Sequence, residues 1–370
     1  MSIKVAVVDD SLLYRRVIVD VLQKIDDVEV VGQFASGKAF LNKVKELSPD
    51  IITLDLEMPE MDGLSVLTEL KKEKINSFVI IVSSHSVKGS TLTIKALDKG
   101  AFDFITKPQG KSAEDSKEFI LKELSPLFTA LKHRVSIRNI FSKSSSSFEK
   151  DSVVNNISTT IENNRVSNSL GVLDKIINKS KVEMILIGVS TGGPGALAQI
   201  IPQIKPNLGL PIIIVQHMPP IFTKTLADSL NDKTSLSVVE VENNMSVVPN
   251  TIYIAPGGKQ MKIINSLAGE KKLMITDDPP ENNCKPSVDY LFRSASLNFP
   301  GKSVAFIMTG MGNDGTMGLK LLKRNGTYVY AQNEETCVVF GMPKIAIEAN
   351  VVDEVIPLGA IAEKINLLGK

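Results

Sequence analysis

The chain has 370 residues, 43% of them hydrophobic, and a formal net charge of +1. A chain of this length is expected to bury two hydrophobic cores. The nearly balanced charge, without a basic patch interleaved with aromatic residues, argues against a nucleic-acid partner. Two cysteines, Cys284 and Cys337, lack short paired spacing. We therefore expect reduced thiols with a structural role, and neither a disulfide framework nor a metal site.

Targeting and membrane signals are not expected in this chain. The first residues enter a strand directly, without the charged start, apolar run and small-residue cleavage site of a signal peptide. The apolar stretches, such as 182–189 and 211–215, are far shorter than the roughly 20 residues that a membrane span requires. These features predict buried parallel strands in a cytoplasmic protein that does not insert into a membrane.

The first third of the chain alternates apolar strands and helices. Strands are expected near Val5, Val30, Ile52, Ile80 and Phe104, and helices near Val17, Leu41, Leu67 and Ile94. This alternation predicts a five-stranded, doubly wound α/β domain, to which we assign residues 1–125.

Carboxylates gather at the strand ends of this first domain. Asp9 and Asp10 follow one predicted strand and Asp55 ends another, so their mutual repulsion calls for a cation, and hard oxygen ligands suit Mg²⁺. Ser83 adds a hydroxyl and Lys107 an ammonium group at two further strand ends. Together these groups could surround a phosphoryl group on Asp55. The alternative, a solvated acidic loop with a surface lysine, is disfavoured because four strand ends agree.

Residues 126–180 are expected to form a helical extension and a flexible linker. A helical pattern runs from Ala113 to about Arg138 with an apolar stripe, which we expect to pack mainly on the first sheet, leaving a smaller share for the second domain. The stripe comprises Leu121, Leu124, Leu127, Phe128 and Leu131. Residues 142–169 are polar and of low complexity, as is typical of a linker.

Residues 181–370 again alternate strand and helix, which predicts a second doubly wound, mostly parallel sheet. Strands are expected near Leu186, Ile213, Val238, Tyr253, Phe306 and Val329, and helices near Leu197, Leu226, Leu291, Leu319 and Ile345. Dense strand and turn signals in 236–275 also indicate a local antiparallel ribbon.

Three chemically suited side chains follow strands of this second domain. Ser190 lies in a glycine-rich turn, His217 at the next strand exit, and Asp314 just past a third strand. The carboxyl ends of parallel strands open on one crevice, so these residues can meet there. A serine needs a base to become nucleophilic, and His217 can be that base while Asp314 orients its ring. With an unperturbed imidazole, activity should fall as the pH drops through about 6 to 7.

Each of the three residues has a structural alternative. Ser190 could be a helix N-cap, His217 a structural residue before a proline turn, and Asp314 the N-cap of a helix from Gly315 to Lys323. The combination of nucleophile, base and orienting carboxylate at equivalent strand ends favours catalysis.

Two other functions remain open. The stretch Gly310–Gly315 fits a dinucleotide-binding fingerprint, with Glu334 and Glu335 about twenty residues further on. That fingerprint normally follows the first strand of its sheet, whereas several strand-helix units precede this one. The second is a phosphorylation-dependent interaction module with an inactive hydrolase domain. Only an intact set of the three catalytic candidates argues against it.

Residues 2–125 resemble a response-regulator receiver domain. The resemblance rests on the acidic strand ends and the lysine described above. The resemblance implies that Asp55 is the phospho-acceptor and that Ser83 is the switch hydroxyl. It also implies that Lys107 contacts the phosphoryl group, and that Mg²⁺ is held by Asp9, Asp10, Asp55 and the carbonyl of Glu57.

Residues 181–370 resemble the catalytic domain of the chemotaxis protein-glutamate methylesterases, the CheB family. The motifs that carry this resemblance are Gly188–Pro194, Gln216–Pro220, Ile254–Gly258, Pro286–Phe292, Thr309–Gly315 and Gly341–Pro343. One departure is Gln260, where many relatives have a histidine; we expect it at the rim of the site, with an effect on substrate affinity.

The resemblance implies a serine hydrolase that removes glutamate methyl esters from chemoreceptors, receives its phosphoryl group from a chemotaxis histidine kinase, and needs no cofactor for the esterase step. Related enzymes also deamidate receptor glutamines. The backbone N–H groups of Thr191 and Met311 are implied as oxyanion donors. Because a regulatory domain is joined to a hydrolase by a linker, we expect the receiver to cover the catalytic crevice until Asp55 is phosphorylated.

Overall fold

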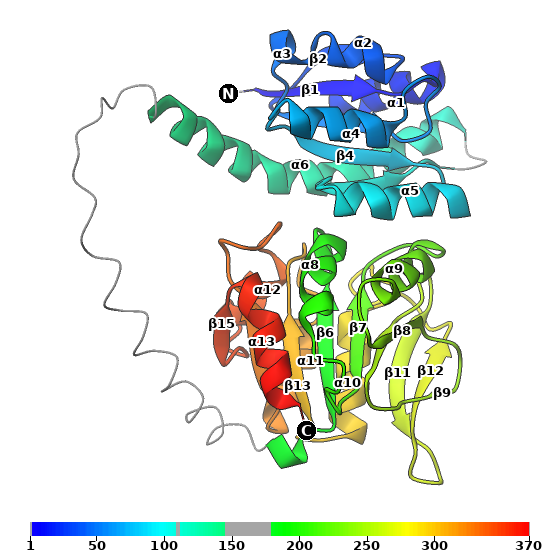
Figure 1. Ribbon diagram of the computed structural model, residues 1–370, viewed down its shortest axis with the longest axis vertical. Helices are drawn as coiled ribbons and strands as arrows, with labels where there is room; N and C mark the ends of the chain where they lie inside the picture. Colours follow the sequence, from blue (N-terminus) through cyan, green and yellow to red (C-terminus); the bar gives the residue numbers. More distant parts are fainter. Residues whose placement is uncertain (1, 109–111, 145–178, 370) are drawn as a thin grey trace.

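The computed structural model describes residues 2–108, 112–144 and 179–369. The predicted linker lies outside the described residues from position 145 to 178. The chain contains two parallel sheets, one in each half of the described residues, each with helices on its faces (Figure 1). The predicted α/β fold class is therefore confirmed.

The first domain contains a five-stranded parallel sheet in the order β2-β1-β3-β4-β5. Its strands are β1 (Ile3–Val8), β2 (Val28–Phe34), β3 (Ile51–Asp55), β4 (Phe78–Ser83) and β5 (Asp103–Thr106). Its helices are α1 (Leu12–Leu22), α2 (Gly37–Leu41), α3 (Val44–Leu47), α4 (Gly63–Lys72), α5 (Val87–Asp98) and α6 (Ala113–Ser144). Strands β1 and β3 are almost wholly buried, as expected for central strands covered on both faces.

Polar residues in the loops that follow the strands cap the N-termini of the next helices. Ser11, Asp62 and Ser86 each accept a hydrogen bond from a backbone N–H in the first turn of α1, α4 and α5. Such caps satisfy N–H groups that have no partner within the helix. The strand-to-helix turns on this side of the sheet are thereby fixed, and the acidic residues lie among them.

Helix α6 serves both domains. Leu124, Phe128 and Leu131 are fully buried in the core that α6 forms with α1 and the first sheet, as predicted for the apolar stripe. Further along the helix, the guanidinium of Arg134 donates to the carbonyl of Cys337 in the second domain. This contact with the second domain comes from a residue outside the predicted apolar stripe.

The second domain contains a seven-stranded parallel sheet in the order β15-β14-β13-β6-β7-β10-β8. Its strands are β6 (Met184–Val189), β7 (Ile212–Gln216), β8 (Ser237–Glu240), β10 (Thr251–Ile254), β13 (Ser303–Ile307), β14 (Tyr328–Gln332) and β15 (Glu354–Ile356). Its helices are α8 (Gly193–Ile200), α9 (Phe222–Asn231), α10 (Val288–Asn298), α11 (Thr316–Arg324), α12 (Met342–Glu348) and α13 (Leu358–Leu368).

The predicted antiparallel ribbon is present. It consists of β11 (Gln260–Asn265) paired with β12 (Lys271–Thr276), which also pairs with β9 (Met245–Ser246). Strands β8 and β10, which fall in the same stretch of sequence, instead join the edge of the parallel sheet. The short strand β15 and helix α13 were not predicted.

The first domain lies over the carboxyl ends of the second sheet, with α5 against α8 and α9 (Figure 1). The Ser90 hydroxyl is 2.8 Å from that of Thr225, and the Lys233 ammonium is 2.5 Å from Asp98. Because catalytic residues are expected at these strand ends, the arrangement places the first domain above the candidate site.

Candidate active site

A histidine and a carboxylate from separate strand ends form a close pair. His217, directly after β7, has its Nε2 atom 2.8 Å from Oδ2 of Asp314, which lies in the loop after β13. Only 14% of the His217 side chain and 2% of the Asp314 side chain are exposed. The carboxylate therefore fixes the ring and leaves Nδ1, the nitrogen not bonded to Asp314, for chemistry.

Asp314 is itself held by the start of another helix. Its two oxygens accept the backbone N–H groups of Val288 and Asp289, at the first turn of α10, and the hydroxyl of Ser287. Asn282 donates a further hydrogen bond through its side-chain amide. Helix α11 has Gly315 at its N-cap position, so the structural alternative for Asp314 is wrong: this carboxylate serves His217 and α10.

These contacts shift the pKa values of the pair in opposite directions. Burial raises the pKa of Asp314, but the hydrogen bonds from His217 and the α10 backbone outweigh it and lower the pKa to about 2. Burial lowers the pKa of His217, but Asp314 and Cys284 outweigh it and raise the pKa to about 9. The site thus stabilises an ion pair between imidazolium and carboxylate.

Ser190 follows β6 in a tightly packed turn. Its backbone N–H donates to the carbonyl of Thr309, and a Cβ atom added at Gly310 would lie 2.7 Å from the Ser190 Cβ. A glycine is therefore required at position 310 to bring the loops after β6 and β13 together. Helix α8 is capped by Gly192, so the N-cap alternative for Ser190 is wrong as well.

Gln216 joins the serine and histidine segments. This buried side chain donates through Nε2 to the carbonyl of Ser190 at 2.9 Å and to that of His217 at 3.2 Å. One amide thus holds the backbone of both candidate catalytic residues. The sequence showed it only as the residue before His217.

The candidate residues open on a cavity of about 490 Å³. Its lining from the second domain includes Ser190, Thr191, His217, Cys284 and Met311. The nucleophile candidate, the base candidate and both oxyanion candidates therefore face the same space. A hydroxyl, an imidazole fixed by a carboxylate and nearby backbone N–H groups can together carry out acyl transfer.

Comparison with known protein families assigns both halves of the chain. Residues 5–114 match the model of the response regulator receiver domain, and residues 185–365 match the model of the CheB methylesterase. A protein-glutamate methylesterase/protein-glutamine glutaminase from Desulfotalea psychrophila is 44% identical over 365 residues, which are 98% of each chain. The chain belongs to this family.

Other members of the CheB methylesterase family show the same full-length similarity. Proteins of the same name from Archaeoglobus fulgidus and Bacillus subtilis are each 39% identical, over 98% of this chain and 97% of theirs. The crystal structure of the Thermotoga maritima CheB methylesterase catalytic domain is 42% identical with a TM-score of 0.49, covering 50% of this chain and 98% of that one.

The first domain supplies the other wall of the cavity. Its lining from this side includes Asp103 and Phe104 of β5 and Glu123 of α6. The Phe104 ring stacks on Phe222 of α9 with centroids 4.7 Å apart, and the Asp103 carboxyl hydrogen-bonds the side chain of Thr191. Burial raises the pKa of Asp103 to about 7. Receiver residues thus lie directly against the turn that carries Ser190.

The acidic cluster predicted in the receiver is assembled. Side-chain oxygens of Asp9, Asp10 and Asp55 lie within 4.8 Å of one another, and the Lys107 ammonium is 2.7 Å from Asp55 and 2.9 Å from Asp9. Burial raises the pKa of Asp9 to about 6 despite this lysine. A divalent cation would relieve the mutual repulsion, and the donor set, all oxygen, fits Mg²⁺.

The Ser83 hydroxyl and the Glu57 carboxylate form hydrogen bonds with groups other than Asp55. The Ser83 hydroxyl donates to the carbonyl of Gly89, at the start of α5, and accepts from Thr93. Glu57 donates its backbone N–H to Asp55 Oδ1, whereas its carboxylate accepts from Ser84. The Ser83 hydroxyl is thus bonded to the helix that contacts the second domain.

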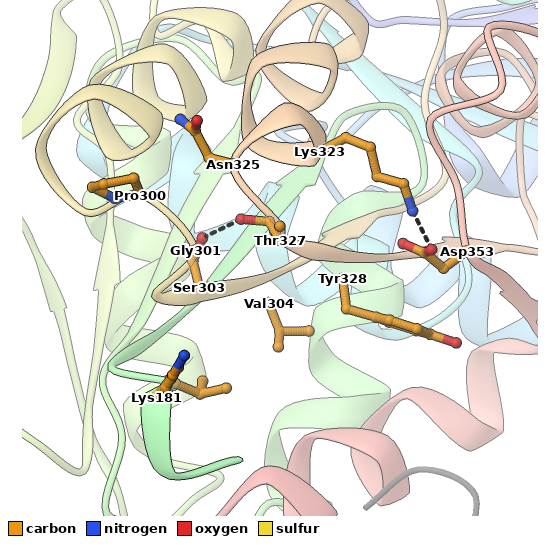
Figure 2. A pocket seen from close by; sticks show the side chains of 12 residues that line it. Lys181, Pro300, Gly301, Ser303, Val304, Lys323, Asn325, Thr327, Tyr328 and Asp353 are labelled. Carbon is orange, nitrogen blue, oxygen red and sulfur yellow. Dashed lines mark hydrogen bonds and ion pairs between the residues drawn. The ribbon is translucent and has the colours of Figure 1, made fainter. Parts of the chain in front are cut away.

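A second cavity, of about 530 Å³, lies at the opposite end of the second sheet. Figure 2 shows that its polar side chains pair with each other: Lys323 with Asp353, and Ser303 with Thr327. Its residues belong to the amino ends of β13 and β14, far along the strands from Ser190 and His217. We therefore assign the chemistry to the first cavity.

Two residues have a different place from the one predicted. Gln260 is fully buried and not at the rim: it donates to the carbonyls of Pro279 and Cys284 and accepts from the Ser287 N–H, because β11 turns this side chain inward. Cys284, expected to be a structural thiol, has its Sγ atom 3.7 Å from Nδ1 of His217. Only its position two residues before the Pro286–Phe292 motif could have indicated this.

The described helices include none that combines the length and the apolar character needed to cross a bilayer.

Proposed function

We propose that this chain is a phosphorylation-activated protein-glutamate methylesterase in which Ser190, His217 and Asp314 form the catalytic triad. The observation that carries the proposal is the His217–Asp314 pair beside a cavity that Ser190 also lines. The names of full-length relatives support the reaction and the substrate class. The substrates are then methylated glutamates of chemoreceptors.

In this mechanism Ser190 Oγ attacks the ester carbonyl of a methylated glutamate while Nδ1 of His217 accepts its proton. Nε2 cannot take that proton, because it donates to Asp314. The protonated imidazole then gives its proton to the methoxy oxygen, and methanol leaves a glutamyl-enzyme. Water enters, gives a proton to Nδ1, and attacks the acyl group; return of that proton to Ser190 frees the carboxylate.

The developing oxyanion needs donors in the same cavity. We assign this role to the backbone N–H groups of Thr191 and Met311, which both line it. Donors held in place in a partly water-excluded site stabilise the transition state more than they stabilise the planar ester.

Deamidation of receptor glutamines is a second activity of the same site. The relatives are also named protein-glutamine glutaminases. Ammonia would replace methanol as leaving group, and the glutamyl-enzyme and its hydrolysis would be identical.

The receiver takes its phosphoryl group on Asp55 from a chemotaxis histidine kinase. Asp9, Asp10, Asp55 and the Glu57 carbonyl are the groups that would hold Mg²⁺. When bound, this ion neutralises charge on the transferring phosphoryl group. Lys107, already 2.7 Å from Asp55, pairs with the added negative charge. Since such kinases act on the cytoplasmic side, we propose a cytoplasmic location.

The structure offers a physical route from Asp55 to the catalytic domain. A phosphoryl group on Asp55 draws the Ser83 hydroxyl away from Gly89 and Thr93, which hold it to α5. The same helix carries Ser90, which bonds Thr225 of α9, and Asp98, which pairs with Lys233. Rearrangement at α5 therefore weakens the contacts that keep the receiver over the cavity.

We keep the domain boundaries inferred from the sequence: a receiver over residues 1–125, a helical extension and linker over 126–180, and a catalytic domain over 181–370. The family matches, 5–114 and 185–365, lie inside the two outer segments. Helix α6 crosses the first boundary, so the receiver and the extension share one helix.

Release of methanol from methylated receptor membranes tests the proposed reaction. Wild-type protein and the Ser190→Ala variant are compared at equal concentration, with a phosphodonor and Mg²⁺ present. We expect release by the wild type alone. Equal rates for both proteins, or no release by either, would favour a phosphorylation-dependent interaction module over an enzyme.

A further inference from the structure

The Cys284 thiol and the Nδ1 atom of His217 lie at the separation that a metal ion imposes on two of its ligands. Sγ of Cys284 is 3.7 Å from Nδ1 of His217. A tetrahedral zinc ion with typical Zn–S and Zn–N bonds holds these two atoms about 3.6 Å apart. Little movement of either side chain is needed to place an ion between them.

The surroundings of His217 match those of a metal-bound imidazole. A histidine that ligates a metal through one nitrogen nearly always donates its other N–H to a carboxylate or carbonyl, which fixes the tautomer. Here Nε2 is 2.8 Å from Asp314, whose own position is fixed by the first turn of α10. The ligand atoms of His217, Cys284 and Asp314 all lie within 4.8 Å of one another.

The backbone that carries Cys284 is also held in place. Its N–H donates to the Glu281 carbonyl, its carbonyl accepts from the Glu281 N–H, and Gln260 donates to that carbonyl from the buried side. Both Cys284 and His217 line the cavity, which gives an ion a route of entry and space for water ligands. The site therefore has two prepared protein ligands and open positions.

We propose that Cys284 and His217 form a reversible inhibitory site for a soft divalent metal ion such as Zn²⁺. The inference rests on the proposed function for its consequence: an ion on Nδ1 occupies the lone pair that must accept the Ser190 proton. It binds to the thiolate and the neutral imidazole, so the Cys284 proton is released to solvent together with the Nδ1 proton of a protonated His217. The hard-ion cluster of the receiver, all oxygen, is chemically distinct from this nitrogen and sulfur pair.

Binding is tested separately from activity with Co²⁺ as a spectroscopic probe on the full-length protein in excess Mg²⁺, which occupies the receiver cluster. The wild type should show a sulfur-to-cobalt charge-transfer band, and Zn²⁺ should abolish it. The band should be lost in Cys284→Ser and in Cys284→Ala, and kept in Cys337→Ala, which removes the other thiol. A band that survives in both Cys284 variants overturns the proposal.

Inhibition is then measured with Zn²⁺ on methanol release, each variant relative to its own rate without zinc. We expect the zinc concentration for half-inhibition to rise at least tenfold in Cys284→Ser and to stay within twofold in Cys337→Ala, with full recovery on adding a chelator. Equal sensitivity of wild type and Cys284→Ser contradicts the site. A protein that binds Co²⁺ through Cys284 but never releases methanol retains the metal site and refutes the proposed esterase.

Discussion

Phe104 at the end of the receiver sheet stacks on Phe222 at the start of α9, with ring centroids 4.7 Å apart and ring planes 20° apart. Both rings belong to segments that border the cavity, since Phe104 lines it and Phe222 follows the His217 loop. This contact joins the end of the receiver sheet to the helix that follows the His217 loop.

Replacing Phe104 with alanine should raise the basal activity of the unphosphorylated protein. Loss of an aromatic pair removes about 0.5–1.5 kcal/mol beyond the buried area, and an interdomain coupling of about 1–3 kcal/mol corresponds to a 5- to 150-fold effect. We expect an increase of about 3- to 10-fold in methanol release.

Phe34→Ala is the matched control, because it removes a receiver aromatic whose partner is Phe40 within the same domain. It should leave the basal rate within about twofold if the receiver remains folded. Equal increases in the two variants would indicate general loosening of the receiver rather than loss of the interdomain contact.

Replacing any of the three proposed triad residues should remove most of the activity, because the three act together. Ser190→Ala and His217→Ala should each lower kcat about 10³-fold or more, and the double variant should lose little beyond either. Asp314→Ala should retain more activity, because His217 remains as a mis-oriented base. Rates of hydrolysis are compared after circular dichroism has shown that each variant is folded; multiplicative losses in the double variant would contradict a shared mechanism.

The activity should rise with pH toward the alkaline range. His217 must be neutral to accept a proton, and Asp314 and Cys284 raise its pKa to about 9, well above the range of about 6 to 7 expected for an unperturbed imidazole. Below the pKa the neutral fraction grows about tenfold per pH unit, so kcat/KM should increase between pH 7 and 9 and then level off.

Cys284→Ala, which removes one of the contacts that raise this pKa, should move the inflection to lower pH. The profile is measured with a chelator present to exclude metal ions. A wild-type inflection near 6.5 would show that the ring is not held as the structure indicates.

Docking of the receiver should depend on the charge of Asp103. Burial, with a smaller effect of Glu123, raises the pKa of Asp103 from 3.8 to about 7. A group with a raised pKa in the docked state takes up a proton on docking, so docking weakens as the pH rises toward 7 and is constant above it. Asp103→Asn, which stays neutral, should strengthen docking and lower the basal rate at pH 7.5.

This effect is measured as the ratio of unphosphorylated to phosphorylated activity, which cancels the pH dependence of His217. Glu123→Gln, a neighbouring neutralisation, should change the ratio less, since Glu123 is the smallest cause of the Asp103 shift. A higher basal rate in Asp103→Asn would mean that its charge helps to hold the domains together through Thr191.

The positions of the candidate catalytic residues could be predicted because strand ends of a parallel sheet converge whatever the rest of the chain does. Ser190, His217 and Asp314 each follow an apolar strand, and the crevice follows from topology. The inward direction of Gln260 could not be predicted, since it depends on the ribbon β11–β12 folding back onto the loop that carries Cys284.

The contacts between the domains could not be predicted from local sequence patterns. In the sequence Asp103 is an ordinary strand residue, and its place beside Thr191 results from the docking of the two domains, in which α5 packs on α8 and α9. In the same way, the pKa of His217 depends on Cys284, a residue 67 positions away in sequence. Packing of distant segments, and not sequence spacing, decides both.

Inhibition of the esterase by a receiver that covers its cavity can be tested directly. Methanol release is compared among the unphosphorylated full-length protein, the same protein with a small phosphodonor and Mg²⁺, the Asp55→Asn variant, and a fragment spanning residues 175–370. We expect the fragment and the phosphorylated protein both to be at least about fivefold faster than the unphosphorylated protein. Asp55→Asn should not respond to the phosphodonor. A folded fragment that is no faster than the unphosphorylated full-length protein would contradict inhibition by the receiver.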